Sequence, residues 1–248
     1  MTHLGKKVII TGAARGIGLG IARRLVKEGA CVALCDLDFE KAEEEAAALN
    51  GSGFKAIAFK ADISKVSDIK KMIEHCAGHF SGLDILINNA GILDSSSITE
   101  MKEETWDRVM AVNLKGTFFC CQAAVPFLKE SPAPRIVNIS SIAGRMGGYE
   151  ASLSYAASKG GILSMTMGMA RQLAPFQITV NALCPCPIET VMIQEWTAEQ
   201  KAGLKQKIPL GRLGSIDDIA GAAAFLTGDD AAFITGLLLD VNGGMYMG

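Results

Sequence analysis

Two residues of one predicted helix, Tyr155 and Lys159, have the types and the spacing needed for proton transfer. Residues i and i+4 lie on the same face of a helix, so the phenol and the ammonium group would be neighbours. A phenol has an ordinary pKa of about 10, too high for acid–base work at neutral pH. A nearby ammonium group favours the phenolate and is expected to lower the pKa of Tyr155. The pair alone is a common accident of sequence, and the alternative is a buried tyrosine beside a surface lysine.

A glycine-rich segment near the N-terminus, TGAARGIG (11–18), has the pattern of a phosphate-binding loop. Gly12, Gly16 and Gly18 would let the backbone turn tightly and approach a pyrophosphate with no Cβ in the way. The segment follows a strand-like run and opens a predicted helix, whose N-terminal N–H groups and dipole attract anions. This position between a first strand and a first helix indicates more than the glycines alone.

Asp36 ends the second predicted strand, about twenty residues after the glycines, where dinucleotide-binding folds carry an acid. A carboxylate there accepts hydrogen bonds from the adenosine ribose hydroxyls and repels a 2′-phosphate. Arg15 argues the other way, because a guanidinium in this loop could pair with that phosphate. Asp36 lies where a protein would distinguish the 2′-hydroxyl of NAD from the 2′-phosphate of NADP, so the sequence favours NAD. The alternative for Asp36 is an ordinary helix-capping aspartate.

Short β-branched runs alternate with longer amphipathic segments along the chain. The predicted strands are residues 8–11, 31–36, 56–62, 83–88, 135–140, 178–183 and 237–241. The predicted helices are residues 16–28, 38–49, 64–79, 105–128, 155–173 and 217–226. This alternation is typical of parallel βαβ units, and no linker or repeat interrupts it. We expect an α/β protein: one Rossmann-type domain over residues 1–248, with a doubly wound seven-stranded parallel sheet and helices on both faces.

The composition argues against several classes of function. The chain has 248 residues, 20% of them charged, and a net charge of −2, so it lacks the basic footprint of a nucleic-acid binder. No apolar run approaches the ~18 residues of a membrane helix and no signal-like segment precedes the first strand, which predicts a cytoplasmic protein. The seven cysteines have no C-x-x-C spacing and the three histidines no ligand spacing, so no metal site is expected.

Two predicted helical segments, residues 117–128 and 161–170, are apolar nearly all round. A helix on one face of a sheet needs only one apolar stripe. The excess favours a second buried surface, and we expect a homo-oligomer, either a tetramer or a dimer. The alternative is a helix buried inside the monomer.

Several motifs follow one another in order: TGAARGIG (11–18), NNAG (88–91), Asn113, Ser141 and YAASK (155–159). Together with a proline-bearing loop after the sixth strand, they resemble the short-chain dehydrogenase/reductase family over nearly the whole chain. The resemblance implies that Tyr155 exchanges a proton with the substrate oxygen and that Lys159 tunes Tyr155 and holds the nicotinamide ribose. It also implies that Ser141 hydrogen-bonds the substrate oxygen and that Asn113 holds a water linking Lys159 to solvent.

The same resemblance assigns the walls of a cofactor cleft. The residues expected to bind the cofactor are Gly12, Arg15, Gly16, Ile17, Gly18, Asp36, Asp62, Ile63, Asn89, Ala90, Gly91, Tyr155, Lys159, Pro185, Ile188 and Thr190. Asp62 and Ile63 resemble the pair that frames the adenine. Ile188 and Thr190 resemble the groups that hold the nicotinamide carboxamide. Asp84 is expected to brace the fold.

The chain departs from the family pattern at two places. Ser141 precedes Tyr155 by fourteen residues, one more than usual, which leaves the shape of that pocket wall open. Cys186 stands where the family usually has glycine, within LCPCPIET (183–190). It is either a tolerated small residue, or it narrows the nicotinamide loop and leaves a thiol open to modification. A disulfide between Cys184 and Cys186 would be strained by the intervening proline and is not expected.

The loop at about 189–209 is expected to be the substrate lid. Much of the sequence is similar to 3-oxoacyl-[acyl-carrier-protein] reductases, which use NADPH and present basic side chains to the acidic carrier. Two such positions carry Pro132 and Phe176 here, although Arg135 remains. With Asp36, this favours an NAD-linked dehydrogenase of a small secondary alcohol, polyol or ketone. The alternatives are an NADPH-dependent 3-oxoacyl-carrier reductase and a catalytically silent nucleotide-binding regulator, although the regulator would be expected to have lost Tyr155 or Lys159.

Overall fold

A computed structural model describes residues 2–148, 152–188 and 197–248. The strands are β1 (Lys7–Thr11), β2 (Cys31–Asp36), β3 (Lys55–Lys60), β4 (Ile85–Asn88), β5 (Arg135–Ile139), β6 (Thr179–Pro185) and β7 (Leu238–Val241). They form one seven-stranded parallel sheet in the order β3-β2-β1-β4-β5-β6-β7. The predicted α/β fold is confirmed, and every predicted strand overlaps an observed one.

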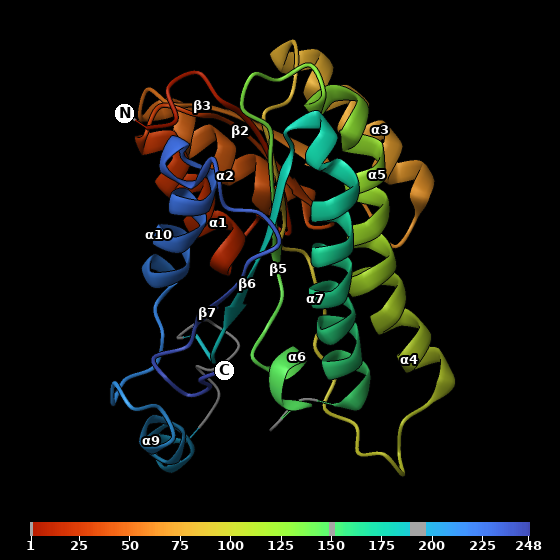
Figure 1. The fold of residues 1–248 in the computed structure, drawn as a ribbon, viewed down its shortest axis with the longest axis vertical. Coiled ribbons are helices and arrows are strands. Elements are labelled where there is room, and N and C mark those ends of the chain that lie inside the picture. The colour runs from red at the N-terminus through yellow and green to blue at the C-terminus, as the bar shows by residue number, and fades with distance from the viewer. Residues whose placement is uncertain (1, 149–151, 189–196) are drawn as a thin grey trace.

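Helices cover both faces of this sheet (Figure 1). One layer consists of α1 (Gly16–Lys27), α2 (Phe39–Gly51) and α10 (Ile216–Thr227), and the other of α3 (Val66–Phe80), α5 (Thr117–Leu128) and α7 (Leu153–Leu173). Successive side chains of a strand enter opposite layers: Ile9 and Ile10 are both fully buried, in different hydrophobic clusters. The central strands are therefore apolar at nearly every position rather than at alternate ones.

The predicted helix at 105–128 is divided into three parts. α4 (Glu103–Met110) leads into a π-helical turn, η1 (Ala111–Gly116), and α5 follows directly. Apolar periodicity gives no signal for such a turn, although π turns occur frequently at functional sites. Asn113 lies within η1 and is fully buried.

Smaller elements gather at the carboxyl ends of the strands. α6 (Ala143–Met146), α9 (Ala198–Gln206) and the C-terminus lie below these ends in Figure 1. The short helices η2 (Ala174–Phe176) and η3 (Asp229–Ala231) precede β6 and β7. The sequence patterns did not predict α6. Within the described ranges, no helix combines the length and apolar character needed to cross a bilayer.

The chain reverses the direction of winding between β1 and β4. The first three strands extend the sheet to one edge, and the chain then returns to place β4 beside β1 on the other side. In such sheets the loops after the two central strands diverge and leave a crevice at their carboxyl ends, where ligands bind.

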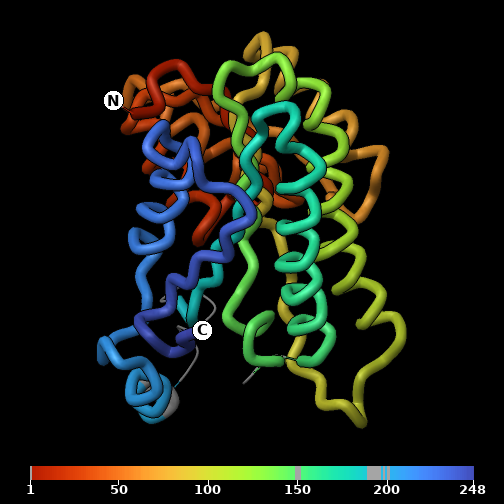
Figure 2. The backbone as a smooth tube through the Cα atoms, viewed as in Figure 1, coloured from red at the N-terminus to blue at the C-terminus, as the bar shows by residue number. Residues whose placement is uncertain are grey.

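The His3 side chain ties the N-terminal segment to the ends of α1 and α10. Figure 2 traces the backbone of this segment in red. His3 is fully buried, with Nδ1 2.7 Å from Glu28 Oε2 and Nε2 2.9 Å from Thr227 Oγ1. Thr2 and Arg24 also donate hydrogen bonds to Glu28. Burial opposes the ionisation of Glu28, but these hydrogen bonds outweigh it and lower the pKa of Glu28 from 4.5 to about 2.

We therefore expect acid to weaken the fold through Glu28. Because its folded-state pKa lies below the unfolded value, ionised Glu28 contributes stability above pH 4.5, and the contribution is lost as the pH falls towards about 2. Glu28→Gln should lower the free energy of unfolding at neutral pH by on the order of 1–2 kcal/mol and flatten its dependence on acid pH. Urea unfolding at a series of pH values measures both effects. Glu43→Gln, an exposed acid on α2, is the control; an unchanged acid profile in Glu28→Gln would contradict the assignment.

Candidate active site

A cleft of about 930 Å³ opens at the carboxyl ends of the strands, near the upper limit of ~1,000 Å³ for small-molecule sites. Of the predicted site residues, its walls include Gly12, Arg15, Gly16, Ile17, Asp36, Asp62, Ile63, Asn89, Ala90, Gly91, Ser141, Tyr155, Lys159, Pro185 and Ile188. Gly18 and Asn113 lie just behind the walls, against Gly12 and Gly91. Thr190 lies outside the described residues. The fold thus brings together residues from most of the length of the chain.

The glycine-rich loop has the shape that an anion requires. Gly12 has φ +63°, and a Cβ there would lie 2.7 Å from Ala90 Cα, so only glycine fits. Among the described residues, no side chain caps the N-terminus of α1, and its first turn holds no acid. The first N–H groups of α1 therefore remain available to a phosphate, and the helix dipole adds a favourable field. These features fit the pyrophosphate of a dinucleotide.

Two residues brace this loop from below. Asn89 Nδ2 donates to the carbonyl oxygens of Thr11 at 3.0 Å and Gly12 at 2.8 Å. Thr11 Oγ1 accepts from the backbone N–H groups of Asn89 and Ala90, both at 3.1 Å. The sequence analysis did not predict this role of Thr11, because a threonine before the first glycine has no distinctive pattern. The loop is fixed before any ligand arrives.

The Asp36 carboxylate is held by backbone donors at the end of β2. Its Oδ2 accepts from Ala14 N at 2.9 Å and its Oδ1 from Asp38 N at 3.0 Å. Each carboxylate oxygen accepts two hydrogen bonds, so capacity remains for ribose hydroxyls. The residue that caps α2 is Asp38, which accepts from Lys41 N, and not Asp36. The capping alternative for Asp36 is therefore wrong.

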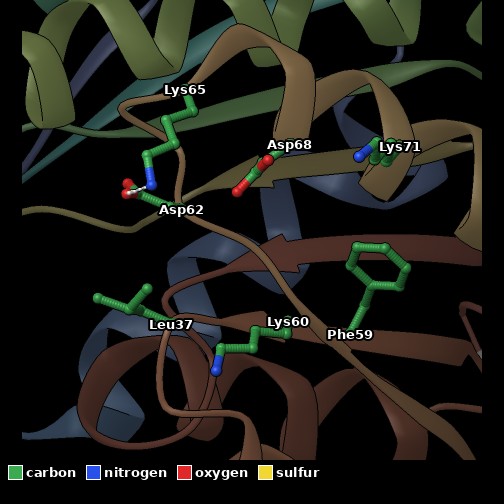
Figure 3. A pocket seen from close by; sticks show the side chains of 7 residues that line it. All are labelled: Leu37, Phe59, Lys60, Asp62, Lys65, Asp68 and Lys71. Atoms are coloured by element: carbon green, nitrogen blue, oxygen red, sulfur yellow. Dashed lines mark ion pairs between the residues drawn. The ribbon is translucent and has the colours of Figure 1, made fainter.

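A smaller cavity of about 340 Å³ adjoins the end of the cleft where the sequence predicts the adenosine, and it shares Leu37 and Asp62 with the cleft. Figure 3 shows Asp62 paired with Lys65, at 3.3 Å. The hydrogen bond from the Ser64 hydroxyl is the largest of the effects that lower the pKa of Asp62, which keeps this carboxylate ionised at neutral pH. Lys60 extends along the same cavity.

Tyr155, Ser141 and Lys159 meet at the other end of the cleft. The Ser141 hydroxyl faces the Tyr155 phenol closely enough to lower the pKa of Tyr155, despite the additional residue between them. Lys159 Nζ lies 5.6 Å from the centre of the Tyr155 ring and donates to Ile139 O at 2.8 Å. The α7 helix therefore presents the phenol and the ammonium group on one face, as their spacing predicts.

Burial dominates the electrostatics of this pair. It lowers the pKa of Lys159 from 10.5 to about 8. Burial also raises the pKa of Tyr155, and the hydrogen bond from Ser141 offsets only part of that rise. The expectation of a lowered tyrosine pKa is thus wrong for this structure, because desolvation of the phenolate outweighs the Ser141 hydrogen bond that lowers the pKa.

Asn113 connects the loop after β4 to α7. Its Oδ1 accepts from Ile92 N at 2.8 Å, and its Nδ2 donates to Ile92 O at 3.0 Å and Ser158 Oγ at 3.1 Å. Both of its amide hydrogens are thus used within the protein, so the side chain acts as a brace. The implied water link to Lys159 stays a prediction.

Two buried serines also support α7. Their role was not predicted from the sequence. Ser140 Oγ donates to Lys159 O at 2.8 Å, and Ser158 Oγ donates to Tyr155 O at 2.7 Å. Neither serine has a spacing that separates it from an ordinary core serine. They fix the backbone that carries Tyr155 and Lys159.

The segment after β6 lines the side of the cleft where the sequence predicts the nicotinamide. Cys186 is 5% exposed, and burial raises the pKa of its thiol. Its Sγ would lie 3.4 Å from a Cβ at Gly214, whose backbone pairs with Ile188. A buried, protonated thiol is a poor nucleophile, which favours the alternative of a tolerated small residue over a thiol open to modification. All seven cysteines lie in the described ranges and are free, which agrees with the expectation for Cys184 and Cys186.

Two other predicted roles are decided by position in the sheet. Asp84 accepts from Lys7 N at 2.8 Å and from Ser131 Oγ at 2.5 Å, so it braces the fold as expected. Arg135 is the first residue of β5 and 5% exposed, at the end of the sheet opposite the cleft. It therefore cannot be a basic residue on the rim of the cleft in the same chain.

Comparison with known proteins gives the same picture. A family model described as "Enoyl-(Acyl carrier protein) reductase" matches residues 12–246. A 3-oxoacyl-[acyl-carrier-protein] reductase of Staphylococcus aureus (strain Mu50 / ATCC 700699) is 40% identical over 243 residues, 98% of each chain. The chain belongs to the short-chain dehydrogenase/reductase family. A (3R)-3-hydroxyacyl-CoA dehydrogenase of Rattus norvegicus is 39% identical, covering 96% of this chain and 95% of that protein.

A solved structure supports the assignment. The short-chain dehydrogenase/reductase of Brucella melitensis described as "Glucose/ribitol dehydrogenase" matches with a TM-score of 0.93 and 36% identity, over 100% of this chain and 99% of that one. As a short-chain dehydrogenase/reductase, the protein is an NAD(P)-dependent oxidoreductase that acts on CH–OH groups.

Proposed function

We propose that this enzyme transfers a hydride between NAD(H) and a secondary alcohol or its ketone, with Tyr155 as the acid and base. The observation that carries the proposal is the joint placement of two groups in one cleft. Ser141, Tyr155 and Lys159 lie at one end, and the backbone-held Asp36 lies at the other. When bound, the nicotinamide cofactor accepts or supplies the hydride.

The residues of the chain would manage the proton. The Ser141 hydroxyl orients the substrate oxygen beside the Tyr155 phenol. In reduction, Tyr155 donates its proton to that oxygen; in oxidation it receives one. A raised pKa keeps Tyr155 protonated at neutral pH, which suits the reductive direction. The Lys159 ammonium stabilises the phenolate that donation leaves, and it would hold the nicotinamide ribose.

Asp36 supports the choice of NAD over NADP. Its two oxygens are held by Ala14 and Asp38 N–H groups and would accept from the ribose hydroxyls. A 2′-phosphate at the same place would bring about −2 charge against a fixed carboxylate. Asp62 and Ile63 would frame the adenine, and the α1 N-terminus would hold the pyrophosphate.

Apolar residues among the described walls of the cleft favour an apolar substituent on the substrate. Leu93, Met146, Leu204 and Met245 line the cleft, and Met146 belongs to α6, which begins two residues after Ser141. Among small secondary alcohols, polyols and ketones, this lining supports an alcohol or ketone with an apolar group more than a polyol, whose hydroxyls would lose their hydrogen bonds there. Part of the lid, residues 189–196, lies outside the described residues.

A second candidate is a 3-oxoacyl-[acyl-carrier-protein] reductase that uses NADPH. The 40% identity to the Staphylococcus aureus enzyme favours it. The position of Asp36 argues against its cofactor, and the position of Arg135 removes one basic residue expected near the site. We therefore place it second.

Initial rates with NADH and NADPH decide between these two proposals. We expect kcat/KM for NADH to exceed that for NADPH by about tenfold or more. NADPH would lose a charge-assisted hydrogen bond from the ribose 2′ position to Asp36, which contributes roughly 1.5–3 kcal/mol. The panel should contain apolar ketones, polyol-derived ketones and acetoacetyl thioesters, each followed by absorbance of the reduced nicotinamide. A clear preference for NADPH with acetoacetyl thioesters would contradict the first proposal and support the second.

We also propose a cytoplasmic homo-oligomer, either a tetramer or a dimer. Trp106, Phe118 and Met167 are 38%, 41% and 37% exposed on the outer side of α4, α5 and α7. Large apolar side chains at this level of exposure suit a subunit interface. Free cysteines throughout the chain suit a reducing compartment.

A further inference from the structure

The ribose end of the cleft contains a second carboxylate, Asp38, with two separate partners. Its Oδ1 accepts from Lys41 N at 3.3 Å and so caps the N-terminus of α2. Its Oδ2 forms an ion pair with Arg15 of the glycine-rich loop. The N-cap contact fixes where the Asp38 side chain lies, and Arg15 reaches across from the other loop to meet it.

Arg15 is the cation that a 2′-phosphate would need. Both Arg15 and Asp38 line the cleft beside Asp36. The neighbouring lysines have other partners or positions: Lys41 pairs with Glu44 and Glu45, and Lys65 pairs with Asp62. Lys60 lines the adjoining cavity (Figure 3) rather than the cleft.

We propose that Asp38 is a second residue that determines the nucleotide preference, because its ion pair withholds Arg15 from the 2′-phosphate of NADP. This inference rests on the proposed use of NAD. Asp36 excludes the phosphate directly, and Asp38 removes the positive charge that would otherwise compensate. The subsite thus holds two carboxylates against one guanidinium. This net negative charge disfavours the phosphate but not an uncharged ribose hydroxyl, which can donate a hydrogen bond to Asp36.

The size of the effect depends on the background. Arg15 and Asp38 are 65% and 44% exposed, and exposed ion pairs are weak. With Asp36 present, its repulsion dominates and Asp38 contributes little. With Asp36 removed, binding of the 2′-phosphate depends on whether Arg15 is free to pair with it. The effect of Asp38 on NADPH affinity should then become measurable.

The test measures binding of NADPH and NADH by nicotinamide fluorescence, which needs no substrate. Asp38→Ser is the variant of choice, because serine retains the N-cap of α2 but cannot pair with Arg15. In the Asp36→Ala background, we expect Asp38→Ser to tighten NADPH binding by about fivefold to tenfold and to change NADH binding by less than about twofold. Adding Arg15→Ala should remove that gain.

Two controls separate this pairing from a general charge effect. Glu40→Gln removes an exposed acid in the first turn of α2 that does not line the cleft, and it should leave the NADPH affinity of Asp36→Ala unchanged. If Asp38→Ser gives the same gain with the Arg15→Ala substitution as without it, or no gain at all, the inference is overturned. Preference of the wild-type protein for NADPH would instead overturn the proposed cofactor and the inference with it. These two failures are distinguishable.

Discussion

Tyr155→Phe is expected to reduce turnover by about 10²–10⁴-fold, the usual contribution of a positioned proton donor. The substitution removes only the hydroxyl and keeps the ring in place on α7. Because the phenol does not hold the adenosine or the pyrophosphate, the dissociation constant of NADH should change by less than about threefold. Stopped-flow or steady-state assays give the first number, and fluorescence titration of NADH gives the second.

Tyr246→Phe is the matched control for the loss of a hydroxyl. Tyr246 lies near the C-terminus, where its ring packs 5.6 Å from Arg145, and it has no role in the proposed chemistry. We expect its turnover to stay within about twofold of wild type. Undiminished turnover in Tyr155→Phe would refute the assigned proton donor. A wild-type protein that binds NADH yet turns over no substrate in the panel would instead favour the silent regulator.

Lys159→Met should abolish most turnover and at the same time stabilise the protein. Burial lowers the pKa of Lys159 from 10.5 to about 8, so at neutral pH the fold holds an ammonium group at a cost. The difference corresponds to roughly 3 kcal/mol by linkage, of which the lost hydrogen bond to Ile139 offsets about 1 kcal/mol. A net gain of about 1–3 kcal/mol in the free energy of unfolding follows. Urea unfolding at neutral pH measures it.

The pH dependence of that gain gives a second readout. The cost of the charged amine is fully present below about pH 8 and disappears as the pH rises to 10.5. The free energy of unfolding of the wild-type protein should therefore approach that of Lys159→Met as the pH rises through this window. Lys70→Met replaces an exposed lysine of α3 and should change stability by less than about 0.5 kcal/mol at either end. A destabilised Lys159→Met at neutral pH would show that the amine is held without cost.

The sequence determined the fold and most of the cleft, because both depend on patterns that are local or strictly ordered. Apolar strands alternating with amphipathic helices admit few arrangements other than a doubly wound sheet. In that arrangement every strand ends at one edge, so Gly12, Asp36, Ser141 and Pro185 must converge there. The four-residue spacing placed Tyr155 and Lys159 on one face of a helix.

Features that depend on burial or on distant partners were decided only by the tertiary structure. Desolvation reversed the expected direction of the Tyr155 pKa, and packing after β6 left Cys186 only 5% exposed. The π turn gave Asn113 a partner in Ile92, and the sheet placed Arg135 away from the cleft. The ion pair of Arg15 with Asp38 joins residues from two loops, and no spacing in the chain encodes that contact. Pairwise distance and solvent exclusion are properties of the packed chain, so they cannot be read from residue types alone.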